Sequence, residues 1–487
     1  MGETIEEVRV KAKVPIPKPK LAKMTNKPPR TDDAKLIQRL YRQNRRKAVR
    51  SITDPDPSFC KIPKAMVEDH FRKLGESQET DFNIYQRTPA SRPKLEIRRV
   101  TYEEVERALR KAENTAPGED RIAYRDWLLV DPKCYVLTTI FNICLRFKKV
   151  PISWKKSSTI LIFKNKGSKD DICNWRPIAL ASTISKLYSK VLANRLTKWL
   201  EANNVLSHCQ KRFMPYDGVL EHNFVREEHI NRVQKTPRAE LCIAWLDFAN
   251  AFPSVSQEAL LEGLSKTGVG TSLVSIVKDL FDGATTQVRT DEGYTAEIQV
   301  KRGIKQGDPI SGLLFNIAID AIIRKVQGNQ NHHNILAFAD DLTPMDKTPA
   351  GLQAKLDIVD RLGKRIRMPL KPTKFKTLHL AMRTSVPTEL FVGDHRIEIM
   401  EEGDHVEYLG KPVGFRIISP TAKLEEFLEK GLTILTSKLA PWQKIDAMKT
   451  FVYPSMTRDE DGDLPEDPVG PNRQRLQEGD PNSPLPK

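Results

Sequence analysis

The sequence has few cysteines and no long hydrophobic run. Its six cysteines form no C-x-x-C pair, which is the spacing that zinc ribbons and zinc knuckles need. Their wide separation is typical of free thiols in a reducing compartment. The first ten residues contain no apolar stretch that would indicate a signal peptide. No run reaches the roughly 18 apolar residues of a membrane helix. We therefore expect an intracellular chain, in the nucleus and cytoplasm, with no membrane partner.

Acidic residues are the minority. The chain holds 79 Lys and Arg against 63 Asp and Glu, a formal net charge of +16. Much of the excess lies in the first fifty residues, which hold fifteen basic and five acidic side chains. A basic balance favours a polyanionic partner such as nucleic acid, although it also serves solubility.

Both ends have compositions that cannot form a core. Residues 1–30 are rich in Pro and Lys, which predicts a disordered basic arm, and residues 457–487 combine prolines with acids, which predicts a disordered tail. After the arm, Thr31 or Asp32 is expected to cap one helix that continues to about Ile52.

Between these ends, apolar spacing predicts a mixed α+β chain. Thr101 and Glu104 form a capping box that opens a helix. A second helix with a cap at Ser254 is expected after the strand 241–247. Helices are also expected over 177–200, 311–326, 349–366 and 421–439, a hairpin over 286–300, and two strands joined by an acidic tip over 334–346.

Three aspartates carry the candidate chemistry. Asp247 ends the apolar run LCIAWLD, and Asp340 with Asp341 forms the acidic tip of the later hairpin. Hard divalent cations prefer carboxylate oxygens, and a two-metal site needs acids from more than one strand. Paired aspartates are more often solvated turn formers. Here, however, apolar residues flank the pair on both sides, which favours a buried site.

Several segments resemble reverse transcriptases. AFADDL (337–342) resembles their catalytic hairpin, LDFANAFPSV (246–255) the segment of the first catalytic aspartate, and RGIKQGDPISGLLFN (302–316) the template- and substrate-contacting segment. Further matching segments are TILIFKNKG with NWRPIAL (159–180), KPTKFKTLHL (371–380) and VEYLG (406–410). The closest resemblance is to non-LTR retrotransposons that insert into ribosomal RNA genes, through TAPGEDRI (115–122), CQKRFMPYDGVLEH (209–222) and KLAPWQKIDAMKTFVYPSM (438–456).

The resemblance implies a nucleotidyltransferase, an RNA-directed DNA polymerase that binds an RNA template, a DNA primer and dNTPs. It implies two Mg²⁺ ions, for which Mn²⁺ can substitute, held by Asp247, Asp340, Asp341 and the backbone carbonyl of Phe248. One ion would activate the primer 3′-hydroxyl, and the other would hold the triphosphate. Lys374 is the implied proton donor to pyrophosphate, and Lys376 is its rival.

The resemblance also assigns binding residues. Lys164 and Arg176 would grip the triphosphate, with Lys166 as an alternative to Lys164. Phe252 would be the steric gate against ribonucleotides. The remaining assignments are Gln306 and Gly307 under the nascent base pair, and Tyr408, Leu409 and Gly410 as the primer grip. Gly312 departs from the family, which commonly has proline at that position.

The implied fold is a right hand with an antiparallel palm sheet and helices on one face. The expected parts are a basic arm (1–30), an N-terminal helical extension (31–114), fingers with part of the palm (115–240), palm (241–415), a partial thumb (416–456) and a tail (457–487). We expect the chain to stop shortly after the thumb, without the nuclease of longer relatives. Two other functions remain open: a nucleic-acid-binding remnant without turnover, and an RNA-dependent RNA polymerase, which Phe252 disfavours.

Overall fold

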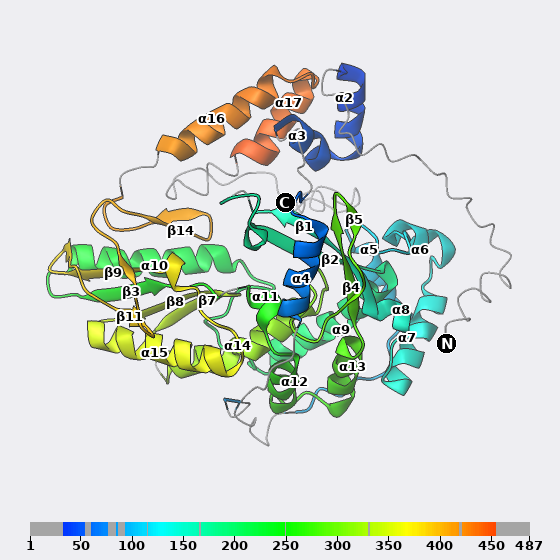
Figure 1. Cartoon of the computed structure of the whole chain (residues 1–487), viewed down its shortest axis with the longest axis horizontal. Coiled ribbons are helices and arrows are strands. Elements are labelled where there is room, and N and C mark those ends of the chain that lie inside the picture. Colours follow the sequence, from blue (N-terminus) through cyan, green and yellow to red (C-terminus); the bar gives the residue numbers. More distant parts are fainter. Residues whose placement is uncertain are drawn as a thin grey trace, which may run out of the picture. The chain divides into compact units, whose positions relative to one another are not determined.

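The computed structural model describes residues 33–53, 60–75, 84–85, 93–113, 115–164, 167–248, 250–329, 332–417 and 421–453 (Figure 1). The predicted basic arm and tail lie outside the described residues. The chain divides into two compact units. One consists mainly of residues 57–409 and the other mainly of residues 25–56 with 419–487. Helices together with antiparallel and mixed sheets make the chain an α+β protein.

A six-stranded sheet is the first of the two main β elements of the larger unit. Four of its strands run in the order β9 (Lys376–Ala381), β3 (Leu241–Trp245), β8 (Asp341–Asp346) and β7 (Ile335–Phe338). These neighbours are antiparallel. Two short strands, β10 (Thr384–Ser385) and β13 (Glu398–Ile399), pair with β9. All five residues of β3 are buried, as expected for a strand with cores on both faces.

Helices cover both faces of this sheet, so the prediction of helices on one face is wrong. Side chains of β3 alternate: Cys242 and Ala244 join the core that includes α14 (Ser311–Gln327) and α15 (Pro349–Arg365). Leu241, Ile243 and Trp245 join a second core with Ile230 and Val233 of α10 (Gly218–Lys235). Figure 1 shows α10 and α15 on opposite sides of the strands. The continuous apolar sequence of β3 reflects this double burial.

A five-stranded sheet forms the second β element of this unit. Its strands are β1 (Lys156–Phe163), β2 (Trp175–Ala181), β4 (Thr285–Thr290), β5 (Gly293–Tyr294) and β6 (Ile298–Gln299). β1 pairs antiparallel with β2 and parallel with β4. The predicted hairpin around residues 291–293 is confirmed as β4–β5. Helix α4 (Lys64–Leu74) packs on β4 and β6, with Val67 in a shared core with Val288 and Ile298.

The other helices of the larger unit surround these sheets. They are α5 (Tyr102–Arg110), α6 (Tyr124–Val130), α7 (Tyr135–Phe147), α8 (Ile152–Lys155), α9 (Thr183–Ala202), α11 (Ala251–Ser254), α12 (Gln257–Lys266) and α13 (Thr271–Phe281). Short elements complete it: η1 (Ile172–Asn174), η2 (Pro372–Lys374), and the hairpins β11 (Phe391–Val392) with β12 (His395–Arg396) and β14 (Val406–Tyr408) with β15 (Lys411–Val413).

No single helix among the described residues is long and apolar enough to cross a bilayer. The pair Tyr124–Val130 and Tyr135–Phe147 meets that length and composition only when joined, across a bend of 110°.

Local sequence signals located several elements correctly. The Thr101–Glu104 capping box is confirmed at α5, and α14, α15, α16 (Thr421–Thr436) and the hairpin β7–β8 follow their predictions. The helix expected at 177–200 begins only at Thr183, because residues 177–181 pair with β1 as part of β2. The cap expected at Ser254 is instead Ser256, which accepts from Ala259 N before α12.

The smaller unit joins segments from the two ends of the described chain. Its helices are α2 (Ala34–Gln43), α3 (Arg45–Thr53), α16 (Thr421–Thr436), α17 (Pro441–Ala447) and the π-helical turn η3 (Met448–Val452). Ile37, Tyr41 and Val49 share one core with Ile434 and Ala447. The single helix expected over 31–52 is two helices, because the chain is extended at Asn44, and its cap is Asp33 rather than Thr31 or Asp32.

A hydrogen bond from Tyr41 joins α2 to α17. The buried Tyr41 hydroxyl donates to Asp446 Oδ2 at 2.7 Å, while the exposed Arg45 pairs with the same carboxylate at 3.3 Å. We expect Tyr41→Phe to destabilise this unit by about 1.5–3 kcal/mol, since the bond has a charged acceptor. Arg45→Ala should cost less than about 1 kcal/mol because the pair is solvated.

The effect of each substitution is measured as the protection of the α2 amides from hydrogen exchange. Tyr41→Phe should lower their protection and Arg45→Ala should leave it nearly unchanged. Equal protection in the two variants would show that the buried hydroxyl does not hold α2 in place.

Candidate active site

Asp247 lies just beyond the end of β3. Leu246, the residue before it, forms an isolated bridge with Leu342 of β8. Leu246 N donates to Leu342 O at 2.9 Å, and Leu342 N donates to Leu246 O at 3.1 Å. This reciprocal pair aligns the end of β3 with the start of β8. Asp247 and Asp341, which are distant in sequence, are each adjacent to this bridge.

Asp340 and Asp341 come from the β7–β8 hairpin. Phe338 pairs with Asp341 across it, so Ala339 and Asp340 form a two-residue turn. Ala339 has φ of +56°, in the left-handed region, and its backbone is held by the side chain of Gln210. The turn therefore presents both carboxylates at the tip of one hairpin.

The three carboxylates repel one another. Burial raises the pKa of Asp340, and the charge of Asp247 raises it further. The pKa of Asp341 is raised to about 7, first by burial and then by Asp340 and Asp247. Mutual repulsion of this kind is relieved by a bound cation. The all-oxygen donor set suits Mg²⁺ or Mn²⁺, so these residues fit the divalent ions that reverse transcriptases use.

Lys374 is the lysine beside the first aspartate. Its Nζ lies 3.1 Å from Asp247 Oδ2, because η2 follows directly on Lys371, whose N donates to Asp247 O at 3.1 Å. The rival, Lys376, belongs to β9 and pairs with Glu398 at 3.0 Å. The geometry thus places Lys374, and not Lys376, in contact with the aspartates.

The two predicted phosphate-gripping cations lie at the facing ends of β1 and β2. Lys164 follows β1 and donates from Nζ to Cys173 O at 2.9 Å. Burial lowers its pKa, and so do the charges of Lys374 and Arg176. Arg176 is exposed on β2. The charge of Asp247 acts in the opposite direction on the pKa of Lys164. Lys166 lies outside the described residues.

Phe252 stands in an aromatic stack. Its ring lies on Phe315 with centroids 4.9 Å apart and planes 11° from parallel, and Phe213 meets it edge-on at 6.0 Å. A Cβ on Gly312 would lie 2.4 Å from the Phe213 ring. Glycine in place of the family's proline therefore makes room for Phe213 beside the predicted gate.

Of the remaining predicted residues, Phe248 lies beside Asp247, whereas Gln306 and Gly307 contact Ala179 of β2. The Phe248 side chain is buried and its backbone bridges Leu370, next to Asp247. Gln306 O accepts from Ala179 N of β2 at 2.8 Å. Gly307 has φ of +116°, and a Cβ there would lie 3.0 Å from Ala179 O, so backbone conformation and space both favour glycine.

The predicted primer grip forms the β14–β15 turn. Tyr408 is buried in the core shared with α10, with Arg226 of α10 5.7 Å above its ring. Burial raises the pKa of its phenol. Leu409 and Gly410 have positive φ values of +50° and +83°, as in a tight turn. The buried Tyr408 anchors the turn, and its next two residues form the tip.

Residues 209–213 hold contacts that sequence reasoning did not assign. Gln210 bonds the Ala339 backbone, the Arg212 guanidinium lies 4.9 Å from the Phe338 ring centre, and Phe213 contacts Phe252. By sequence, this segment carried only a resemblance to the non-LTR retrotransposons. It gave no local signal that the segment contacts the β7–β8 hairpin, because these contacts join residues far apart in the chain.

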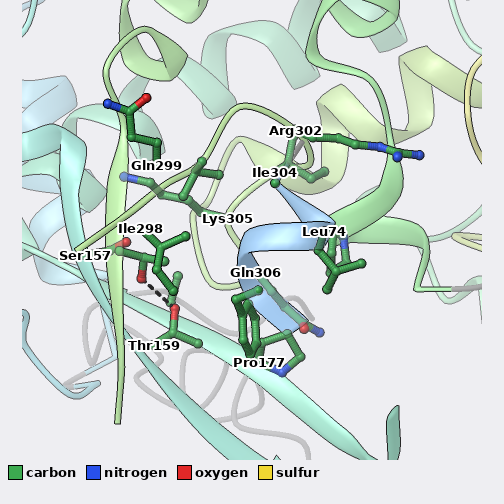
Figure 2. Close-up of a pocket in the computed structure, with 16 residues that line it drawn as sticks. Leu74, Ser157, Thr159, Pro177, Ile298, Gln299, Arg302, Ile304, Lys305 and Gln306 are labelled. Carbon is green, nitrogen blue, oxygen red and sulfur yellow. Dashed lines mark hydrogen bonds between the residues drawn. The ribbon is translucent and has the colours of Figure 1, made fainter. Parts of the chain in front are cut away.

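A separate pocket lies behind this region, between α4, β1, β2, β6 and the segment 300–306. Figure 2 shows Leu74, Pro177, Ile298 and Gln306 on its wall, and a hydrogen bond at Thr159. The Thr159 and Thr286 hydroxyls are 2.8 Å apart. None of the three aspartates lines it, so it is not the site of the chemistry.

A second cluster of metal-ligating side chains lies elsewhere on the six-stranded sheet. Glu240, Cys242 and His379 bring ligand atoms within 4.8 Å of one another. Both ring nitrogens of His379 already have partners at 2.7 Å, Glu240 and Thr388. Burial raises the pKa of the Cys242 thiol to about 12. A packed neutral thiol beside a hydrogen-bonded histidine accounts for the cluster without an ion.

Comparison with known proteins agrees with this geometry. A family model described as reverse transcriptase (RNA-dependent DNA polymerase) matches residues 163–413, just over half of the chain. The Pol polyprotein of the R2 retrotransposable element of Bradysia coprophila is 28% identical over 451 residues, covering 88% of this chain and 50% of that protein. Its counterpart in Nasonia vitripennis is 26% identical, covering 70% and 33% respectively.

A further relative is the RNA-directed DNA polymerase of the mobile element jockey from Drosophila melanogaster. It is 27% identical, over 60% of this chain and 33% of the relative. The chain thus spans between one third and one half of the length of these three relatives. The matched family model runs from Phe163, the last residue of β1, to the end of β15 and includes all three aspartates. The chain therefore belongs to the reverse transcriptase family.

Proposed function

We propose that this chain is an RNA-directed DNA polymerase of a non-LTR retrotransposon that inserts into ribosomal RNA genes. The observation that supports this most is the meeting of Asp247, Asp340 and Asp341 at one end of the six-stranded sheet, beside Lys374. The proposed partners are an RNA template, a DNA primer and dNTPs, inside the cell.

The proposed division of the chain is a right hand. The six-stranded sheet would be the palm, the five-stranded sheet with its helices the fingers, and the unit of α2, α3, α16 and α17 would include the thumb. The N-terminal helices α2 and α3 pack with α16 and α17, so the thumb would include part of the predicted N-terminal extension.

The proposed mechanism is nucleotidyl transfer with two divalent ions. Asp247, Asp340, Asp341 and the Phe248 carbonyl would hold them. When bound there, Mg²⁺ supplies charge neutralisation at the primer 3′-hydroxyl and the triphosphate. Lys164 and Arg176 orient the triphosphate through charge-assisted hydrogen bonds. Lys374, released from Asp247, donates a proton to the leaving pyrophosphate.

Phe252 would select the sugar. Its ring is fixed between Phe315 and Phe213, so it cannot move away from a 2′-hydroxyl. Selection of dNTPs over rNTPs would follow from this rigid contact rather than from a hydrogen bond.

The first prediction concerns catalysis. The full chain should incorporate dTTP on poly(rA)–oligo(dT) with Mg²⁺, and EDTA should abolish the reaction. Asp340→Asn with Asp341→Asn should lower the rate by at least about 100-fold, because transition-state charge loses its stabilisation. Asp291→Asn changes an exposed acid in another hairpin turn and should leave the rate unchanged.

RNA binding by filter retention should be equal in wild type and both variants. Incorporation that survives the double substitution would contradict the assigned mechanism. Absence of incorporation by the wild type, with RNA binding retained, would contradict the proposed activity itself.

The second prediction concerns sugar selection. Phe252→Val should raise kcat/KM for rUTP relative to dTTP by about 10- to 200-fold, the range for one hydrophobic contact. Phe315→Leu disturbs the same stack from the buried side and is the matched control. If Phe315→Leu relaxes selection as much as Phe252→Val, loose packing rather than a direct gate explains the effect.

A further inference from the structure

We infer that Gln210 is a positioning residue that fixes the turn presenting Asp340 and Asp341. The inference rests on the proposed function, because Gln210 would act through that hairpin. It starts from the backbone of Ala339. In two-residue hairpin turns, a first position with positive φ is usually glycine. Here it is alanine, at φ +56°, a conformation that L-residues adopt only when their surroundings hold them there.

Gln210 supplies that support with both ends of its carboxamide. Ala339 N donates to Gln210 Oε1 at 2.9 Å, and Gln210 Nε2 donates to Ala339 O at 3.3 Å. Both backbone groups of one residue are thereby bound by one side chain. Only an amide offers a donor and an acceptor side by side in this way. The side chain is almost fully buried, 2% exposed, so water does not compete for these bonds.

Gln210 is itself fixed in place. Its Oε1 also accepts from Arg212 N at 3.0 Å, which sets the orientation of the amide. The backbone of residues 209–211 lies along β7: Ala337 N donates to Cys209 O, and Lys211 N donates to Ala337 O, both at 3.0 Å. β7 is the last strand of the sheet, so this segment pairs with its outer edge right up to the turn.

The consequence is a rigid separation between the hairpin carboxylates and Asp247. Asp340 follows Ala339 directly, and rotation about the Ala339 backbone would move both aspartates. Metal geometry depends on such supporting contacts, whose loss typically costs about 10–100-fold in metal affinity or activity. Gln210 would therefore control the Mg²⁺ concentration that the enzyme needs, without contacting substrate.

The test compares Gln210→Met, a substitution of similar size without an amide, with wild type. It measures single-nucleotide incorporation across Mg²⁺ concentrations. We expect kcat to fall and the half-saturating Mg²⁺ concentration to rise. The two changes, multiplied together, should amount to about 10-fold or more. The KM for dTTP and RNA binding should stay within about twofold of wild type, because Gln210 is buried, with 2% of its surface exposed.

A double-mutant cycle with Ala339→Gly isolates the backbone role. Glycine adopts positive φ without support, so Ala339→Gly should restore much of the Mg²⁺ response that Gln210→Met loses. If the two substitutions acted independently, their fold-losses in the Mg²⁺ response would multiply instead. Multiplicative losses would overturn the inference, and so would weaker RNA binding with an unchanged Mg²⁺ requirement. If Gln210→Met alone does not fold, the comparison is made with Gln210→Leu in the Ala339→Gly background.

Gln327→Met is the matched control. Gln327 is a buried glutamine that also binds backbone, accepting from Asn334 N at 2.9 Å at the far end of β7. Gln327→Met should lower thermal stability without changing the Mg²⁺ requirement. An equal rise of the Mg²⁺ requirement in Gln327→Met and Gln210→Met would show a general effect of β7 and refute a specific role of Gln210.

Mn²⁺ binding measured by electron paramagnetic resonance separates this inference from the proposed function. Weaker Mn²⁺ binding in Gln210→Met supports the positioning role even if the wild type incorporates no dNTP, a result that would contradict only the polymerase assignment. Wild-type incorporation with equal Mn²⁺ binding and equal Mg²⁺ requirement in both proteins would leave the polymerase standing and overturn the role of Gln210.

Discussion

The candidate site depends on the pairing of β3 with β8. Two hydrogen bonds between Leu246 and Leu342 bring Asp247 beside Asp341, against the repulsion of three carboxylates. Burial, and then the charges of the neighbouring carboxylates, raise the pKa of Asp340 and of Asp341. The packing of β3 between two cores provides the opposing stabilisation, since its side chains are buried on both faces. The packing of β3 between these two cores thus holds three carboxylates close together at one end of the sheet.

The contacts around the aspartates come from segments that are distant in sequence. Residues 209–213 support the hairpin turn through Gln210 and place Phe213 against Phe252. Gly312 permits that placement, because any side chain there would overlap the Phe213 ring. The ring of Phe213 therefore explains why residue 312 is glycine, where the family commonly has proline. Phe252, the predicted sugar gate, and the turn of the β7–β8 hairpin are thus both in contact with this one segment.

Sequence reasoning succeeded where a local rule was sufficient. The capping box at Thr101 and the apolar residues flanking Asp340 and Asp341 each indicated their element correctly. It failed where a partner far along the chain decided the outcome. Residues 177–181 are apolar enough for a helix but pair with β1, and α10 covers a face of the sheet that was expected to be open. At Asn44 the chain breaks one expected helix into two, and both then pack with residues near 434–452.

The sequence by itself determined the family, the order of the motifs and the three aspartates, because these are properties of residue type and spacing. Only the tertiary structure decided that Lys374 rather than Lys376 contacts Asp247, that Gln210 holds Ala339, and that α2 and α3 pack with α16 and α17. The physical reason is that caps and periodicities act within a few residues. Sheet register and core packing, by contrast, join residues whose separation along the chain leaves no local pattern.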